Sequence, residues 1–490
     1  MILKKRLFVV MLLIGFCLTM QADKLENYLE PGLASIKPMD PYNYCKTMAL
    51  PKYAGRLTGH EGYTAAAEWA AGMFCRWGLK PISQKSGYLL EYPSPYTIVD
   101  EAEMTFHLPK KSSGSEESAT MDISLKLLDD FLPLLFSDSG EHTAGVVFAG
   151  WGICAPELGY DDYAGIDPAG KFVLCFRGTP DRREAGFVKH DHHRFRMNMA
   201  KSKGALGIIY IYDKPAANPN GDLVPQFTPA VISEKAADKL LAEKNITSVD
   251  LRKDLQTYKK PLSFPLNARI TYRVVSRHFP EGRGYNIAGY VEGSDSKLKK
   301  ECLVIGGHFD HCGAHCGLIF PGADDNASGS AVVMELAEAF SKLKKRPKRS
   351  VVFVLFGGEE MGLQGSTYFV HHLPSPFEKV DTMFNFDMEG EGDGTVCSHS
   401  PDVPGLPEVL KAADEHVGIL RRTGQMRAVG VRGSDYAPFF QEGAICVAFF
   451  SNGPHLHYHL PGDTIYRINP DIMADIARLA FISSYHWANR

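Results

Sequence analysis

The hydrophobic positions in the second half of the chain follow two alternating periods. Short runs rich in Val, Ile, Leu and Phe predict buried strands at 286–290, 303–305, 351–356, 383–387 and 445–449. Between them, apolar residues spaced for one helix face predict helices near 328–343, 363–371, 405–417 and 471–488. Strands that alternate with helices in this way indicate an α/β fold with a mostly parallel sheet flanked by helices.

Residues 123–267 have a different pattern. AGVVFAGWGI, GKFVLCFRG and GALGIIYIYD are short apolar runs bounded by turn formers, which predict a compact β-rich module with some helix. Because the strand at 286–290 resumes the α/β pattern, the module is expected to interrupt an α/β domain. Its histidines, His190, His192 and His193, have no carboxylate at a recurring spacing, so we expect them in a surface loop.

The segment before the module, residues 23–122, is predicted to have a structural role only. A helix is predicted over 65–77, with Thr64 as its cap and Gly78 as its end. Strands are predicted at 89–92 and 102–106, and no residue pattern in this segment suggests chemistry.

The N-terminus resembles a secretory signal peptide. Lys4, Lys5 and Arg6 precede an apolar run over 7–18 and the small residue Ala22. We therefore expect residues 1–22 to be removed and the protein to be exported. Lipid attachment at Cys17 is the alternative, but Phe16 stands where such a site prefers a small residue. No other segment is predicted to span a membrane.

Composition narrows the class of protein. The 490 residues are 44% hydrophobic and 22% charged, as in ordinary globular proteins, and the net charge of −4 gives no reason to expect nucleic acid as a partner. The ten cysteines include Cys17, and the nine others have irregular spacing, so no disulfide framework is predicted. Cys312 and Cys316 lie near several histidines, but a zinc–thiolate site is not expected because a second Cys-x-x-Cys pair is missing.

Candidate metal ligands follow the ends of the predicted strands, where open α/β sheets place their active sites. These residues are His308 and Asp310, Asp324 and Asp325, Glu359 and Glu360, Asp387, and His459. Divalent cations bind imidazoles and carboxylates, and one carboxylate can bridge two ions. Because two consecutive side chains in a turn rarely reach the same ion, one of the paired glutamates is expected to bind metal and the other to serve as a general base.

The motifs HFDH, PGADDNASG, FGGEEMGLQGS, NFDMEG and YHLPGDT, in this order, resemble the co-catalytic di-zinc aminopeptidase family. That family includes glutamate carboxypeptidase-like enzymes and glutaminyl cyclases. The run VFAGWGICAPELGYDDYAGIDPAGKFVLCFRG is similar to the protease-associated domain. The resemblance implies a mostly parallel-sheet sandwich of the phosphorylase/hydrolase-like zinc exopeptidase type. Its first part is 23–122, the inserted protease-associated domain is 123–267, and its main part is 268–490.

The resemblance also implies two zinc ions, with the ligands His308, Asp325, Glu360, Asp387 and His459. Asp325 would bridge the ions, and in the family the peptide bond after this residue is often cis. Glu359 would be the general base, and Asp310 would hold the imidazole of His308 by a hydrogen bond. Tyr458 would donate a hydrogen bond to the oxyanion. His455 and His457 are expected in the pocket wall or behind the ligands.

The implied activity is that of an exported zinc exopeptidase acting on peptides, with an aminopeptidase as the first expectation. Carboxypeptidase, dipeptidase and cyclase chemistry stay open. The sequence does not place the residues that could bind the substrate's amine or carboxylate, and the candidates are Glu389, Glu391, Arg427 and Arg432. Tyr436 stands where many relatives have His. A metal-free binding protein on the same scaffold is disfavoured because every implied ligand is present. The inserted module is expected to restrict access of long or folded chains.

Overall fold

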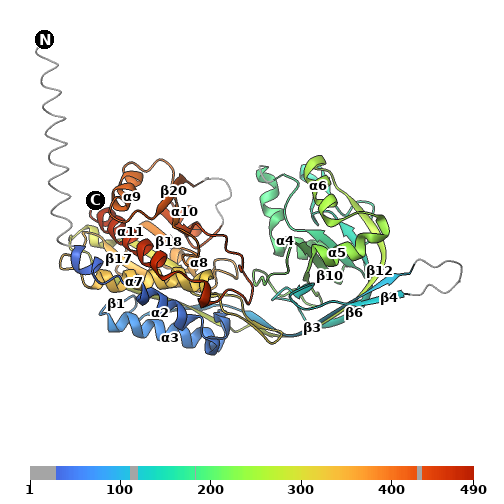
Figure 1. The fold of residues 1–490 in the computed structure, drawn as a ribbon, viewed down its shortest axis with the longest axis horizontal. Helices are drawn as coiled ribbons and strands as arrows, with labels where there is room; N and C mark the ends of the chain where they lie inside the picture. Colours follow the sequence, from blue (N-terminus) through green and yellow to red (C-terminus); the bar gives the residue numbers. More distant parts are fainter. Residues whose placement is uncertain (1–28, 111–119, 182–183, 427–432) are drawn as a thin grey trace, which may run out of the picture.

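The computed structural model describes residues 29–110, 120–181, 184–426 and 433–490. The predicted signal peptide, Cys17, Arg427 and Arg432 lie outside these ranges. The described residues form two bodies, each built around its own sheet and joined by long strands (Figure 1). No helix within the described ranges is both long enough and apolar enough to cross a membrane.

The first body contains a nine-stranded sheet in the order β1-β13-β17-β14-β18-β21-β19-β20, with β2 paired to β13. Its strands are β1 (Lys80–Pro81), β2 (Leu89–Pro93), β13 (Arg283–Val291), β14 (Glu301–His308), β17 (Ser350–Phe356), β18 (Lys379–Phe386), β19 (Thr395–His399), β20 (Leu420–Gln425) and β21 (Ile445–Ser451). Strands β17, β14, β18 and β21 are parallel. Each strand predicted in this half of the chain is present.

The order of the parallel strands creates the crevice for a site. The chain passes from β14 to β17 on one side and then returns to β18 on the other side of β14. Neighbouring connections therefore leave the carboxyl ends of these strands in opposite directions, and ligands in open α/β sheets bind at such a point. The prediction that the chemistry lies at this edge follows from the same topology.

Helices cover both faces of the first sheet, as the alternation predicted (Figure 1). One face packs against α2 (Met39–Met48), α3 (Glu61–Arg76), α7 (Gly329–Ser341), α9 (Leu406–Asp414) and α11 (Pro470–Ala488). The other packs against α8 (Gln364–His371) and α10 (Tyr436–Gln441). Helix α3 begins earlier than predicted, because the side chain of His60, rather than Thr64, accepts a hydrogen bond from Gly62 N at its start.

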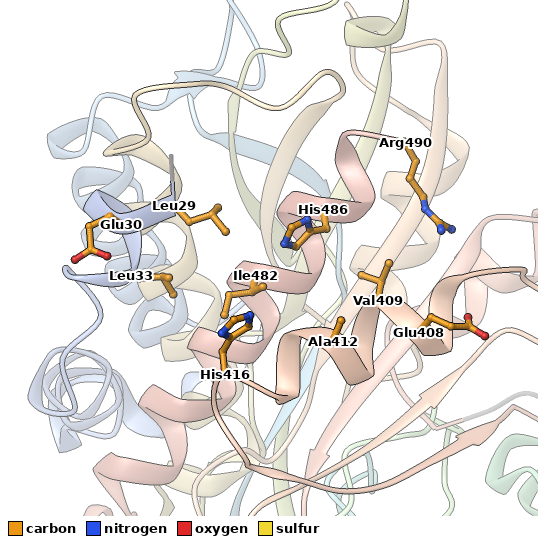
Figure 2. A pocket seen from close by; sticks show the side chains of 10 residues that line it. All are labelled: Leu29, Glu30, Leu33, Glu408, Val409, Ala412, His416, Ile482, His486 and Arg490. Atoms are coloured by element: carbon orange, nitrogen blue, oxygen red, sulfur yellow. The ribbon is translucent and has the colours of Figure 1, made fainter. Parts of the chain in front are cut away.

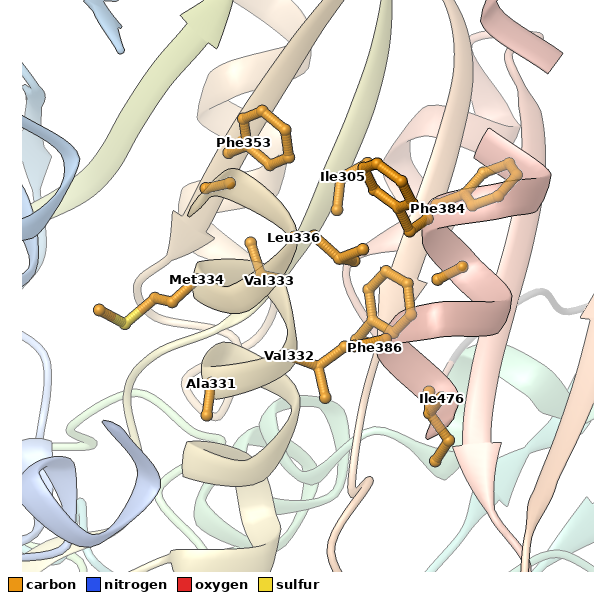
Figure 3. Close-up of a cluster of buried hydrophobic side chains, with 14 of the residues drawn as sticks. Ile305, Ala331, Val332, Val333, Met334, Leu336, Phe353, Phe384, Phe386 and Ile476 are labelled. Carbon is orange, nitrogen blue, oxygen red and sulfur yellow. The ribbon is translucent and has the colours of Figure 1, made fainter. Parts of the chain in front are cut away.

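Helix α7 anchors the metal-side loops to the core. Val332, Leu336 and Phe340 form an apolar stripe that is buried in the cluster shared with the sheet and α11. Val332 and Leu336 of this stripe are labelled in Figure 3. Ile305 and Phe384 reach this cluster from β14 and β18. Full burial of side chains of this size stabilises the fold by about 1.5–3 kcal/mol each. The helix that follows Asp325 is therefore firmly positioned.

The second body contains an eight-stranded sheet in the order β4-β3-β12-β6-β9-β10-β11-β5. Its strands are β3 (Tyr96–Pro109), β4 (Thr120–Ser124), β5 (Phe131–Pro133), β6 (Gly140–Ala149), β9 (Phe172–Phe176), β10 (Gly207–Tyr212), β11 (Ala230–Ser233) and β12 (Ser263–Phe279), and its helices are α4 (His193–Ser202), α5 (Glu234–Leu241) and α6 (Ser248–Tyr258).

The second sheet extends beyond the predicted module, 123–267, at both ends. Strands β3 and β12 pair as a long antiparallel ribbon from Arg269–His107 to Phe279–Tyr96, and this ribbon leads back to the first body (Figure 1). The sequence pattern did not predict this extension, because the composition of β3 and β12 does not change sharply where the two strands leave the module. The identification of the body as a protease-associated domain stays a prediction.

Short elements complete the chain. They are the two-stranded pairs β7 (Cys154–Ala155) with β8 (Tyr160–Asp161) and β15 (Gly313–His315) with β16 (Leu318–Phe320), and the helical turns η1 (Pro51–Arg56), η2 (Pro156–Leu158), η3 (Ala185–Asp191), η4 (Ala242–Lys244), η5 (Leu298–Lys300), η6 (Ala323–Ser328) and η7 (Ile465–Arg467).

Two histidines of the second body do not lie in a surface loop, so that expectation was wrong. His190 is 2% exposed and His193 is 3% exposed. His190 Nε2 lies 3.0 Å from Glu157 Oε1, and its ring packs edge-on against Phe195. His193 opens α4 and accepts a contact from Asn218 at 3.1 Å. Their polar neighbours come from distant segments, which spacing along the chain does not reveal.

Candidate metal centre

The carboxyl ends of the parallel strands bring the predicted ligands together. His308 is the last residue of β14, Asp387 directly follows β18, and Glu360 follows β17 after two glycines. Asp325 lies in η6, just before α7, and His459 lies in the loop after β21. A cavity of about 280 Å³ opens here, and its wall includes all of these residues except His459.

Two groups of donor atoms share Asp325. On one side, His308 Nε2 lies 3.2 Å from Asp325 Oδ1 and 3.4 Å from Asp387 Oδ1. On the other side, His459 Nε2 lies 3.1 Å from Asp325 Oδ2 and 3.0 Å from Glu360 Oε2. The two oxygens of one carboxylate therefore face two different imidazoles.

The arrangement of these donor atoms suits a bound cation better than hydrogen bonds among the side chains themselves. Although they are close, His459 Nε2 and Asp325 Oδ2 are buried and form no aligned hydrogen bond. Buried polar atoms are seldom left unpaired, because desolvation without a partner costs about 1–3 kcal/mol. Imidazole and carboxylate donors fit zinc, which takes N, O and S ligands. The residues present thus fit the metal that the sequence implied.

The imidazole of His308 is held differently from the prediction. Its Nδ1 lies 3.2 Å from the main-chain oxygen of Asp310, whereas the carboxylate oxygen of Asp310 is 3.8 Å away. The carboxylate instead accepts a hydrogen bond from the main-chain nitrogen of Glu359 at 3.2 Å. Asp310 therefore connects the loop after β14 to the loop that carries the paired glutamates. A main-chain acceptor leaves no trace in the sequence, which explains the difference.

The imidazole of His459 is held by the second body. His459 Nδ1 donates to the main-chain oxygen of Ala217 at 2.7 Å, and Ala217 N donates to His459 O at 3.0 Å. Because the other ring nitrogen of a metal-binding histidine sets its orientation, this contact fixes where His459 Nε2 points. The sequence could not reveal it, since both atoms that Ala217 contributes belong to the main chain.

The loop around Asp325 has its own supports. Asp463 accepts hydrogen bonds from the main-chain nitrogens of Asp324 at 2.8 Å and Asp325 at 3.0 Å. The peptide bond between Asp325 and Asn326 is cis, as the family resemblance implied. The Asn326 side chain donates to Phe386 O at 2.9 Å. Sequence reasoning did not single out Asp463 or Asn326, although both lie inside the motifs it used, YHLPGDT and PGADDNASG.

The paired glutamates are in opposite electrostatic states. Burial raises the pKa of Glu359 well above its usual value; nearby His308 opposes this and the Glu360 carboxylate adds to it. Burial also disfavours the charged form of Glu360, but the His459 and His311 imidazoles outweigh it and hold its pKa at about 2. One carboxyl group can therefore carry a proton while its neighbour stays anionic, a division typical of acid–base sites.

Some of the remaining candidate residues line the cavity, and others lie outside its lining. Tyr458 lines the cavity, and its ring stacks on that of His459 with 3.8 Å between centroids. His455 also lines it, with Nδ1 2.5 Å from Asp324 Oδ2, while His457 is not among the lining residues. Glu389 is fully buried below Asp387, so it does not face substrate.

A larger cavity of about 570 Å³ lies elsewhere, between the N-terminal residues of the described chain and helices α9 and α11 (Figure 2). Its lining mixes apolar side chains with His416, His486 and Arg490 (Figure 2). It shares no residue with the cluster at the strand ends. The size of a cavity is therefore not the feature that marks the site in this protein.

Comparison with known proteins identifies the class. Residues 286–482 match the model of peptidase family M28. The chain is 25% identical over 414 residues to Aminopeptidase YwaD of Bacillus subtilis (strain 168), covering 82% of this chain and 79% of that protein. It is 29% identical over 469 residues to an aminopeptidase of Pseudomonas aeruginosa (strain UCBPP-PA14), covering 88% and 76%.

The fold comparison agrees. The aminopeptidase from Aneurinibacillus sp. strain AM-1 is similar to this chain with a TM-score of 0.65 at 20% identity, covering 94% of this chain and 95% of that one. These matches confirm the α/β fold class, and the matched segment contains every predicted ligand. The protein is a peptidase, and its residues 286–482 match peptidase family M28.

Proposed function

We propose that this protein is an exported aminopeptidase that removes N-terminal residues from peptides with the help of two zinc ions. The observation that carries the proposal is the position of Asp325, with one oxygen 3.2 Å from His308 Nε2 and the other 3.1 Å from His459 Nε2. A carboxylate in this position can bridge two cations. His308 and Asp387 would complete one ligand set.

Glu360 and His459 would complete the other set. When bound, the ions would polarise the scissile carbonyl and lower the pKa of the attacking water. Glu359 would accept the proton of that water and deliver it to the departing amine, a task suited to its raised pKa. Tyr458, on the cavity wall, would donate a hydrogen bond to the oxyanion.

The lining of the cavity favours an aminopeptidase over a carboxypeptidase. Besides the four carboxylates assigned to the ions and to the base, the described lining residues include no Lys or Arg. The terminal carboxylate of a carboxypeptidase substrate calls for such a partner. The names of the two similar aminopeptidases support the same choice.

Export and restricted access of long chains are supported by features outside the metal centre. Export rests on the signal-peptide pattern of residues 1–22, with lipid attachment at Cys17 as the alternative. Restriction of access by the second body is supported by its contacts beside the site: Ala217 contacts His459, and Arg194 donates to Met361 O at 3.1 Å. Long substrates would have to pass this contact to reach the cavity.

The test is hydrolysis of amino-acid p-nitroanilides by the purified protein with zinc and with a chelator. Glu359→Gln should lower kcat by roughly 100- to 10,000-fold, since proton transfer by a positioned side chain contributes that much. The matched control is Glu68→Gln on the exposed surface of α3, which should retain full activity. Zinc-loaded protein that cleaves N-blocked peptides from the carboxyl end, and no p-nitroanilide, would replace the proposal with a carboxypeptidase.

A further inference from the structure

A fourth kind of donor lies beside the proposed second zinc position. Cys312 follows β14 by four residues and is fully buried. Its Sγ belongs to a group of buried donor atoms that all lie within 4.8 Å of one another, contributed by His311, Cys312, Glu360 and His459. Two members, Glu360 and His459, are proposed zinc ligands, so the thiol borders the site itself.

The two imidazoles of this group lie beside the carboxylates of both Glu360 and Asp325. His459 Nε2 lies 3.0 Å from Glu360 Oε2 and 3.1 Å from Asp325 Oδ2, yet neither His459 Nε2 nor Asp325 Oδ2 forms an aligned hydrogen bond. His311 Nδ1 lies 2.9 Å from Glu360 Oε1 and 3.8 Å from Asp325 Oδ2. Buried nitrogens and oxygens from several chain segments that lie this close without forming aligned hydrogen bonds are arranged as around a cation.

The backbone holds the thiol in this place. His315 Nε2 donates to Cys312 O at 2.9 Å, while His315 Nδ1 accepts a hydrogen bond from Val99 N at 3.0 Å. On the other side, His311 N donates to Arg56 O at 3.2 Å. The loop is thus tied to β3 of the second body and to η1 of the first, so Cys312 has little freedom to turn away.

Cysteine here also contacts apolar residues. Leu135 and Ala217 of the second body and Phe320 of the first pack with Cys312 in a small cluster. Buried cysteine often serves as a small apolar side chain. Packing alone, however, does not explain why the sulfur lies among three other metal-type donors. An experiment must therefore distinguish packing from metal binding.

We propose that Cys312 binds the second metal ion as a thiolate, beside Glu360, His459 and the shared Asp325. This inference rests on the proposed function, because it requires a metal at that position. As the sulfur–metal bond would form, the S–H bond would break and its proton would pass to solvent, so metal binding would release one proton. Zinc accepts sulfur together with nitrogen and oxygen ligands, and its catalytic sites expand to five ligands, which leaves a position for substrate chemistry.

A thiolate would also select among metals. Soft sulfur donors favour zinc and other late transition ions, whereas magnesium and manganese prefer oxygen. The proposal departs from the expectation that no zinc–thiolate site would form at Cys312 and Cys316, because Cys312 belongs to a group of metal-type donors. Cys316 instead packs against the core of the second body.

The test is the electronic spectrum of the full-length protein loaded with cobalt(II) in place of zinc. A cobalt–thiolate bond gives a charge-transfer band in the near-ultraviolet, separate from the visible bands that any tetrahedral or five-coordinate cobalt site gives. The band should be present in the parent protein, absent in Cys312→Ser and retained in Cys316→Ser. Zinc affinity, measured by competition with a chromophoric chelator, should fall in Cys312→Ser by at least the roughly 10- to 100-fold that loss of a ligand's outer partner costs.

The outcomes are distinct. Visible cobalt bands without the near-ultraviolet band in the parent protein would overturn the thiolate while leaving the metal site of the proposed function in place. No cobalt bands at all would contradict the proposed function itself. If Cys312→Ser does not fold, judged by its circular dichroism, Cys312→Ala provides the same comparison, since alanine keeps the apolar packing and removes the sulfur. A band that persists in either variant assigns the sulfur to another residue.

Discussion

The two bodies of this protein use parallel strands in the same way but place different chemistry at the strand ends. In the first, His308 at the end of β14 and His459 in the loop after β21 both lie within 3.2 Å of Asp325. In the second, β9 ends before Arg177, which pairs with Asp191 at 3.5 Å. Among the described residues, each group of three or more metal-type donors lies in the first body.

Histidines sharpen the contrast. His190, in the second body, faces one partly exposed carboxylate, that of Glu157. Asp325, in the first, is approached by the imidazoles of His308, His311 and His459. Several imidazoles around one buried carboxylate call for a cation, whereas the single imidazole of His190 shares one hydrogen bond with the Glu157 carboxylate. Convergence, and not the number of histidines, therefore identifies the metal centre.

The largest effect should come from the carboxylate that joins the two ligand sets. Asp325→Asn should lower kcat/KM at least about a thousandfold, because metal ions supply several kcal/mol of transition-state stabilisation. Bound zinc per chain, measured by atomic absorption, should fall with it. Asp213→Asn is the matched control, an exposed strand-end aspartate of the second body, and should keep both values. Equal zinc content in Asp325→Asn and the parent would contradict the bridging role.

A smaller effect should follow when the second body releases His459. Ala217→Pro removes the N–H that donates to His459 O and disturbs the carbonyl that accepts from His459 Nδ1. Loss of such an outer partner typically costs 10- to 100-fold in metal affinity, so zinc should dissociate that much more readily in a chelator competition. Ala216→Pro is the control for the backbone effect of proline. Similar zinc affinities in the two variants would show that the second body does not support the metal centre.

The smallest effect concerns the second body alone. Burial raises the pKa of Asp162 from its ordinary value to about 7, against hydrogen bonds from Ile153 N, Tyr160 and Trp151 N that oppose the rise. Between about pH 4 and pH 7 the folded state holds a proton that the unfolded state has released, so stability should fall as pH rises through this window. The slope for one proton is at most about 1.4 kcal/mol per pH unit.

Urea unfolding across this pH range, followed by the fluorescence of Trp151 and the other tryptophans, would measure the effect. Asp162→Asn should remove this part of the pH dependence, whereas Asp254→Asn, an exposed aspartate of α6, should not. A parent protein whose stability rises from pH 4 to pH 7 as steeply as that of Asp162→Asn would show that Asp162 is ionised in the folded state.

The comparison explains how far sequence reasoning reached. In the first body, apolar runs of strand length predicted the strands and the parallel sheet, and the family resemblance implied the cluster of His308, Asp325, Glu360, Asp387 and His459. In the second body, the extension of the sheet beyond the predicted bounds 123–267 and the burial of His190 and His193 were not predicted. Their environment is made by segments far apart in the chain, such as Glu157 with His190.

By itself, the sequence determined the alternation of strands and helices, the side chains at the strand ends and the family to which they belong. These depend on local periodicity and on residue types that have few other uses in such a pattern. Only the tertiary structure decided which atoms hold the ligands: the main-chain oxygens of Asp310 and Ala217, and the carboxylate of Asp463. It also brought the sulfur of Cys312 to the second ligand set. The physical reason is that main-chain groups are the same in every residue, so the fold alone selects those that meet at the site.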